Sequence, residues 1–402
     1  MNRRYGAGLF ALALAVRLFF ALCPPTPEAD AADYLRLAQG LRSGAGYVGP
    51  LGRPTAFRPP LYPLFLAATG PDVRVAPVLQ ALLGATNCLL TVALAARMLG
   101  GPAAWIAGAL LAVDPVQAAA SSRLLSEVLY QTLFLLTLLV LGGERTPGRA
   151  FGAGLLGGAS LLVRSAAMPV LATLAAVCLR RESPRYKSAL LFVAGALLAV
   201  SPWLARNAAV MGAPVLSTQG GITLYSSYLP AQGKLFGVLV HDDEVVRAEA
   251  RGEVAADRQL TRAAMRVALA HPLRTLRLAA LKVAFFWVPI DWEIARSPGA
   301  LSPVYLFALP LAIAAVVAGP RRFHPLPLLL AVLTAFGAIV YGSPRLRLPY
   351  DAAIYVLAAE RIARLWRRPW LWLWAAVCAA LALAGDLPRL AVRSVARALG
   401  FW

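Results

Sequence analysis

The sequence is poor in charge and in the residues that usually form metal or nucleotide sites. Only 14% of its 402 residues are charged, whereas soluble proteins carry about 25%. Its 4 cysteines and 3 histidines show no metal-ligand spacing, and no P-loop or HExxH motif occurs. The GxGxxG spacing at residues 44–49 and 152–157 is a weak signal by itself, because no strand–turn–helix pattern surrounds it. We interpret the cysteines as small buried apolar side chains. Cytoplasmic nucleotide chemistry and zinc-protease chemistry therefore have no support.

The sequence is instead rich in long apolar runs. The chain is 59% hydrophobic, and its mean hydropathy is +0.67. Apolar segments of about 17–25 residues recur along it, and each is long enough to cross a bilayer. We therefore predict an all-α polytopic membrane protein whose residues 1–402 form a single integral membrane domain.

Acidic residues are also scarce, and the formal net charge is +20. On a soluble protein such an excess would suggest nucleic acid as a partner. Here the basic residues cluster in short loops between apolar segments, as the positive-inside rule expects, and no aromatic–basic interleaving of a nucleic-acid surface occurs. We therefore expect no nucleic-acid partner, and we assign the most basic loop, residues 180–187, to the cytoplasm.

The first apolar segment ends near Pro24. We expect it to be an uncleaved span over about residues 5–23 with a cytoplasmic N-terminus, because no clear small-x-small cleavage site precedes Pro24. A cleaved signal peptide is the alternative. Residues 24–73 then form the first extracytoplasmic loop, and residues 205–301 form a later one that contains an interfacial helix.

One segment, residues 276–292, is ambiguous. It either crosses the membrane or lies at its surface, with Lys282 extending to the headgroups. The surface position keeps the basic loops at residues 319–325 and 360–369 inside, so the positive-inside rule favours it. The prediction is then about eleven transmembrane helices, followed by an amphipathic interfacial helix over residues 391–402.

The first extracytoplasmic loop contains the polar stretch "PEADAADYLRLAQGLRSGAGY", residues 27–47. Its pattern predicts a short amphipathic helix at the membrane surface. Asp30 and Tyr34 are four residues apart and point the same way, whereas Asp33 is rotated from Asp30 by about 300°. Either these acids are the solvated face of the helix, or one carboxylate is catalytic. Helix geometry alone favours the solvated face.

Charged residues also lie inside apolar sequence. Glu127 falls within about the first turn of a predicted span, and Arg164 lies between two short apolar segments. Ionisable groups at such depth are costly and are functional by default. The alternative for both is a structural ion pair.

Other polar residues lie at extracytoplasmic boundaries of the predicted spans. This is the wrong side for arginines that serve only the positive-inside rule, and a guanidinium suits phosphate. An anionic partner such as a lipid phosphate is therefore one interpretation, and an interfacial belt of anchoring side chains is the other. The candidate binding residues are Tyr34, Arg58, Tyr62, Arg206, Asn207, Arg345 and Arg347.

The order of these motifs resembles the GT-C glycosyltransferases, in particular the bacterial branch of the protein O-mannosyltransferase and aminoarabinose-transferase superfamily. The resemblance rests on "DAADYLRLAQGLRSGAGY" followed by "RPPLYPLFLAA", on "SPWLARN", on "HPLRTLRLAALKVAFFW" and on "RLRLPYDAAIYVLAA", in which Leu346 replaces the usual Tyr. By this likeness Asp30 takes the catalytic-acid position, because it precedes Tyr34 by four residues. Glu127 matches a recurring second acid.

The resemblance implies an inverting glycosyltransferase in the bacterial inner membrane, with its active site facing the periplasm or the cell exterior. Such an enzyme would move a sugar from a polyprenyl-phosphate donor to a lipid, glycan or protein acceptor. One carboxylate can act as the base, and boundary arginines can hold the departing phosphate without a nucleotide site. We assign no metal ligands; the cofactor stays unknown, and the sequence leaves dependence on a divalent metal open.

Two other functions compete with this interpretation. A lipid or polysaccharide transporter or flippase would also handle an anionic lipid, but transporters usually show internal repeats, and no convincing repeat is present here. A non-catalytic scaffold is the third alternative.

Overall fold

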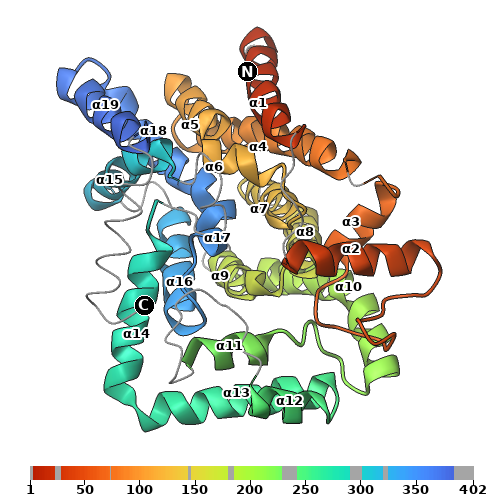
Figure 1. Cartoon of the computed structure of the whole chain (residues 1–402). Helices are drawn as coiled ribbons and strands as arrows, with labels where there is room; N and C mark the ends of the chain where they lie inside the picture. Colours follow the sequence, from red (N-terminus) through yellow and green to blue (C-terminus); the bar gives the residue numbers. More distant parts are fainter. Residues whose placement is uncertain are drawn as a thin grey trace.

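Helices account for nearly all of the secondary structure (Figure 1). The computed structural model describes residues 3–22, 29–72, 74–143, 146–179, 185–228, 242–289, 301–319 and 325–383. Within these ranges no β-strand forms, and an isolated bridge joins Val48 to Pro54. The prediction of an all-α protein is confirmed.

Connections between the α-helices range from a single residue to the loop over residues 43–60. In chain order they are α1 (Arg3–Ala21), α2 (Ala29–Arg42), α3 (Leu61–Ala68), α4 (Val75–Met98), α5 (Gly101–Val113), α6 (Pro115–Ala120), α7 (Glu127–Leu141), α8 (Pro147–Val163), η1 (Ser165–Ala167), α9 (Met168–Leu179), α10 (Arg185–Met211), α11 (Gly220–Tyr228), α12 (Asp243–Glu249), α13 (Glu253–Ala270), α14 (Pro272–Phe286), α15 (Pro303–Ala318), α16 (Leu326–Ile339), α17 (Pro344–Arg347), η3 (Leu348–Tyr350), α18 (Asp351–Leu365) and α19 (Pro369–Leu383).

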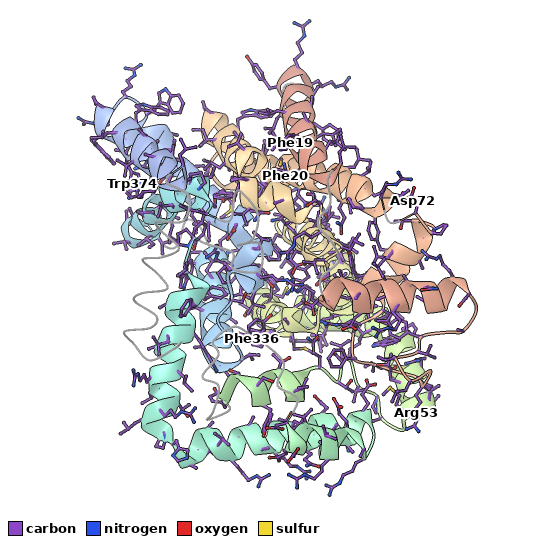
Figure 2. The ribbon with its side chains drawn as sticks, in the orientation of Figure 1. Phe19, Phe20, Arg53, Asp72, Phe336 and Trp374 are labelled. Carbon is purple, nitrogen blue, oxygen red and sulfur yellow. The ribbon has the colours of Figure 1, made fainter. Side chains whose placement is uncertain are left out.

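Several helices have the length and composition of membrane spans. Among the described residues, 3 helices are long and apolar enough to cross a bilayer: α1, α4 and the Tyr186–Met211 part of α10. Shorter apolar helices of 10–17 residues accompany them. Large apolar side chains face outward from this set, including Phe19, which is 75% exposed and projects from α1 in Figure 2. These features indicate a membrane protein, while the count of about eleven spans stays a prediction.

A buried carboxylate marks the break between α5 and α6. Pro115 lacks a backbone N–H and cannot continue the helix of α5, and Asp114 caps the new helix by accepting from the Val116 amide at 3.0 Å. The same carboxylate accepts hydrogen bonds from the Ser302 hydroxyl, at 2.8 Å, and from the Tyr355 hydroxyl. The break is therefore tied to the N-terminus of α15 and to α18.

Glycines allow α8 and α10 to pack backbone against backbone. A Cβ added at Gly154 would lie 2.0 Å from the Phe192 carbonyl oxygen, and one at Gly158 would lie 2.5 Å from the Ala196 carbonyl oxygen. Gly154 and Gly158 are four residues apart, the small-xxx-small spacing that lets helices approach closely in membranes. This contact fixes α8, and with it the adjoining break at Arg164.

Helices α11 to α14 form a unit along one side of the molecule, with α11 beside α13 and α14 turning away from the end of α13 (Figure 1). Ile222, Tyr225, Leu260 and Leu278 belong to the small apolar core of this unit. It occupies the part of the chain that the sequence predicts as the later extracytoplasmic loop.

Helix α14 corrects one expectation about the ambiguous segment. Lys282 is buried, donates to the Ile339 carbonyl oxygen at 3.1 Å, and lies 3.9 Å from the centre of the Tyr228 ring. The expectation that its side chain extends to the headgroups is wrong, because a carbonyl and an aromatic face take up the ammonium inside the fold. Whether α14 crosses the membrane stays a prediction.

Some predicted features lie outside the described residues. These are the final interfacial helix at residues 391–402, most of the basic loop at 180–187, residues 290–292 of the ambiguous segment, and most of the basic loop at 319–325.

We expect Gly158→Ala to lower the free energy of unfolding by about 1–3 kcal/mol, because overpacking at a close helix contact forces backbone shifts. The measurement is the thermal unfolding midpoint of the detergent-purified protein. Gly152→Ala is the matched control: Gly152 lies on the same helix with nothing within 4 Å of an added Cβ, so the change should be neutral or slightly stabilising. Equal midpoints for the two variants would contradict the close contact.

Candidate active site

Helix α2 places two acids at the edge of the buried structure. Its apolar face, which includes Tyr34, Leu37 and Ala38, is buried, and the Tyr34 ring packs edge-on against the Tyr62 ring at 4.8 Å. Asp30 and Asp33 flank this face, with side chains 30% and 31% exposed. The helix predicted from residues 27–47 is therefore present, and exposure alone does not distinguish the two acids.

Arg58 links α2 to the loop that follows it. Its Nη2 atom lies 2.5 Å from Asp30 Oδ1 and 3.3 Å from Asp33 Oδ2, and its Nη1 atom donates to Gln219 Oε1 at 3.0 Å. The guanidinium also lies 5.2 Å from the centre of the Tyr34 ring. Because two prolines follow Arg58 directly, the backbone here has little freedom, which helps to hold the side chain in place.

Arg345 joins two carboxylates that are far apart in the sequence. Its Nη1 atom donates to Asp30 Oδ2 at 2.7 Å, and its Nε atom donates to Glu127 Oε1. Arg345 lies in the short helix α17, whose N-cap Ser343 accepts from the Arg345 amide at 3.2 Å. Three segments of the chain, α2, α7 and α17, therefore meet at this guanidinium.

Glu127 is the most buried acid of the group. It is the first residue of α7, and its side chain is 4% exposed. Arg164, at the break between α8 and α9, places Nη1 2.8 Å from Glu127 Oε1. Within the described part of the chain, Glu127 Oε2 and Arg58 Nε are buried without a hydrogen-bond partner. A ligand entering this site would meet an acceptor and a donor that the protein itself leaves unused.

We call the resulting alternation of charge the charged network. Its members, in order of contact, are Asp33, Arg58, Asp30, Arg345, Glu127 and Arg164. These six members comprise three acids and three arginines, and the exposed Arg36 adds a fourth arginine through its 3.3 Å contact with Asp33. Most of its side chains are buried or half-buried. Removing one member of such an ion pair is strongly destabilising, because it leaves the other charge buried without a partner.

The arginines set the protonation state of Asp30. Burial by itself would raise its pKa, but the neighbouring Arg345 and Arg58 guanidinium groups more than offset this and hold the pKa of Asp30 well below its ordinary range. Asp30 is therefore ionised at neutral pH. In this geometry it becomes an effective proton acceptor only when at least one of its two arginine contacts loosens.

The structure does not bring Arg206 and Asn207 into the charged network. Arg206 donates to the backbone carbonyl oxygens of Thr55 and Tyr47 at 2.7 and 2.8 Å, and also to Asn207 Oδ1. Asn207 in turn donates to the Val215 carbonyl oxygen at 2.7 Å. Both side chains hold loops against α10.

Arg347 also lies apart from the network, although it is two residues from Arg345. Its Nε atom donates to Asp351 Oδ1 at 2.8 Å, and its Nη1 atom donates to the carbonyl oxygens of Phe286 and Val288. Tyr62 is fully buried and donates to Gln80 Oε1 at 2.8 Å. Arg347 and Tyr62 therefore make buried contacts outside the charged network.

Sequence reasoning recognised the depth of Arg164 but assigned it no place in the site, and it passed over Gln219. Arg164 carried a signal, since a charge inside apolar sequence calls for a partner. Gln219 carried none: it contacts Arg58 from 161 positions away, a pairing that no local spacing reveals. Among the described residues no group of three or more His, Cys, Asp or Glu side chains could hold a metal ion.

The fold matches that of known membrane glycosyltransferases. The crystal structure of the Archaeoglobus fulgidus oligosaccharyltransferase with Zn and sulfate matches 94% of this chain with a TM-score of 0.51 and 14% identity. The Archaeoglobus fulgidus oligosaccharyltransferase AglB in complex with an inhibitory peptide and a dolichol-phosphate matches 96% with a TM-score of 0.50 and 11% identity. The chain thus shares the GT-C fold of these structures.

The similarity to these structures covers only part of their length, and the sequence identity is low. The chain covers 52% and 55% of those two structures, about half of their length. ArnT from Cupriavidus metallidurans bound to undecaprenyl phosphate matches 90% of this chain at 12% identity, with a TM-score of 0.43 that does not establish a shared fold. No family model matches the sequence, and no curated protein matches it at a significant level.

The two neighbouring arginines should differ in their effect on stability. Arg347→Gln leaves the buried Asp351 without its ion pair, and breaking a buried pair costs about 3–5 kcal/mol. Arg345→Gln leaves Asp30 with Arg58 and Glu127 with Arg164, so we expect a clearly smaller cost. Thermal unfolding midpoints of the two purified variants test this. An Arg345→Gln protein as unstable as Arg347→Gln would show that Arg345 is mainly structural.

Proposed function

We propose that this protein is a glycosyltransferase that moves a sugar from a polyprenyl-phosphate donor to an acceptor. The observation that carries the proposal is the position of Arg345 between Asp30 and Glu127, at a site where other buried polar atoms lack partners. A phosphate group is the anion best matched to a planar guanidinium. A carboxylate next to a phosphate site supplies the base that glycosyl transfer needs.

Donor binding would change the balance of charge within the network. A phosphate that takes up hydrogen bonds from Arg345 or Arg58 competes with Asp30 for the same donors. Release of Asp30 from one arginine raises its affinity for a proton, because an opposite charge nearby is what lowers it. The empty protein would thus hold the base inactive, and the donor itself would activate it.

The chemical step follows from these positions. Asp30 removes the proton from an acceptor hydroxyl, and the acceptor oxygen forms a bond to the anomeric carbon of the sugar. The bond from that carbon to the phosphate oxygen breaks, and polyprenyl phosphate departs with the electron pair. Attack opposite to the leaving group inverts the anomeric configuration. Arginine side chains stabilise the negative charge of the departing phosphate, and Glu127 with Arg164 holds Arg345 in place.

The fold relatives described above are compatible with this proposal. AglB is described with a dolichol-phosphate, a polyprenyl-phosphate lipid, and with a peptide. We extend to this chain the lipid-phosphate donor, the position in the bacterial inner membrane, and a site that opens toward the periplasm or the cell exterior. The acceptor is a lipid, a glycan or a protein, and the relationship to the bacterial O-mannosyltransferase and aminoarabinose-transferase branch is part of the same proposal.

The central test is the rate of sugar transfer by an Asp30→Asn protein. The change keeps the size of the side chain and removes the proton acceptor, and loss of a general base typically slows a reaction by about 10²–10⁴-fold. The protein is purified and placed in nanodiscs, with a polyprenyl-phosphate sugar and a panel of lipid, glycan and peptide acceptors. Binding of the donor is measured in parallel, and it should persist.

Asp33→Asn is the matched control, because Asp33 lies on the same helix, is equally exposed and also contacts Arg58. We expect it to retain most of the activity. Near-wild-type turnover by Asp30→Asn would refute Asp30 as the base. A wild-type protein that moves the lipid across a bilayer without transferring any sugar would instead support a flippase.

Arg345→Lys should weaken donor binding by about tenfold or more, because it keeps the charge but loses the planar fork that binds phosphate in two places. Arg206→Lys is the comparison, since Arg206 binds backbone carbonyls outside the network. The measurement is a binding titration with the polyprenyl phosphate itself. If both variants bind it like the wild type, phosphate recognition does not depend on Arg345.

A further inference from the structure

Helix α13 separates its charges onto opposite faces. Its acids point into the protein: Glu253 accepts from the Ala56 amide at 2.8 Å and from the Thr218 hydroxyl, and Asp257 accepts from the Gly221 amide at 2.5 Å. These bonds attach α13 to the first loop and to α11. The acids are therefore occupied mainly in holding the helix, and of the outer-face arginines Arg258 is the one that interacts with Asp257.

The outer face carries a row of arginines. Arg258, Arg262 and Arg266 are all exposed and are spaced four residues apart, so they share one side of the helix. With Arg251 they line a shallow hollow of about 510 Å³. Among the described residues, Arg262 and Arg266 form no ion pair with any carboxylate. The face is thus strongly positive and open.

Large apolar side chains lie beside these arginines. Met265 and Leu269 are 54% and 78% exposed on α13, and Leu273 and Leu276 are 82% and 68% exposed at the start of α14. At about 100° per residue, Met265 and Leu269 fall on the same side of the helix as the arginines. The buried side, formed by residues such as Leu260, is opposite. Leucines this exposed are expected where something apolar covers them.

We propose that the outer face of α13 and the start of α14 bind the anionic headgroup region of a phospholipid membrane. The arginines would pair with headgroup phosphates, while Met265, Leu269 and Leu273 would enter the boundary between headgroups and acyl chains. This combination of a basic row and exposed leucines on one helix face is typical of interfacial helices. A soluble polyanion would match the arginines but would leave the leucines in water. The inference is independent of the proposed sugar transfer.

The test uses the full chain in nanodiscs of phosphatidylcholine, with or without phosphatidylglycerol. Ala255, which lines the hollow, is changed to Cys in a background lacking the native cysteines, and the new thiol receives a fluorophore. Lipids with a nitroxide at the headgroup quench it on contact. We expect quenching to increase with the fraction of phosphatidylglycerol and to fall in high salt, which screens exposed charges.

The variant Arg258→Gln/Arg262→Gln/Arg266→Gln should lose this dependence. Each arginine near an anionic surface contributes about fivefold in affinity, so quenching should require a several-fold higher fraction of phosphatidylglycerol. The corresponding triple Lys variant keeps the charge and should behave like the wild type. Arg53→Gln is the matched control, because Arg53 is exposed in the first loop at another edge of the molecule (Figure 2).

Two results would overturn the proposal. One is quenching that is the same with and without phosphatidylglycerol, or that persists in the triple Gln variant. The other combines two observations. The nitroxide lipids do not quench the fluorophore, and soluble polyphosphate binds to the wild type but not to the triple Gln variant. The second result would identify a soluble polyanion as the occupant of this face.

Discussion

The shared guanidinium of Arg345 is the interaction on which the arrangement of the site depends. Asp30 and Glu127 come from the surface helix α2 and the buried start of α7, and both would repel each other if Arg345 did not lie between them. The contact therefore does two things at once. It brings α17 against two distant segments, and it engages only one oxygen of Glu127, whose Oε2 atom is buried without a hydrogen-bond partner. A site built this way is stable when empty and responsive to an incoming anion.

The other arginines show that the same side chain serves different ends according to what surrounds it. Arg206 gives its donors to backbone carbonyls and so organises the first loop, and Arg347 neutralises a buried carboxylate. Among the arginines predicted to bind a ligand, Arg58 and Arg345 instead pair with the partly exposed carboxylate of Asp30. Burial and partner type, rather than position at a boundary, separate the structural arginines from the candidates for binding.

The sequence predicted those parts of the structure that have a local signal. Apolar period and length predicted the helices, including the amphipathic helix α2. The burial of Lys282 was not predictable, because a Lys near the end of an apolar helix has the same local pattern whether it extends to water or finds a carbonyl inside. The separation of Arg345 from Arg347 was equally hidden, since two residues in one short helix differ only through contacts with α2, α7 and η3–α18.

The hydrogen bonds of Asp114 have a consequence for the order in which the chain can mature during synthesis. Its two hydroxyl partners, Ser302 and Tyr355, follow it by 188 and 241 positions. The ribosome has to extend the chain far beyond α6 before that carboxylate can be satisfied, so the corner between α5 and α6 cannot take its final form as it leaves the translocon. Until Ser302 and Tyr355 have been synthesised, the Asp114 carboxylate would face water, lipid headgroups or an insertion chaperone. The break between α5 and α6 would reach its final hydrogen bonding only afterwards.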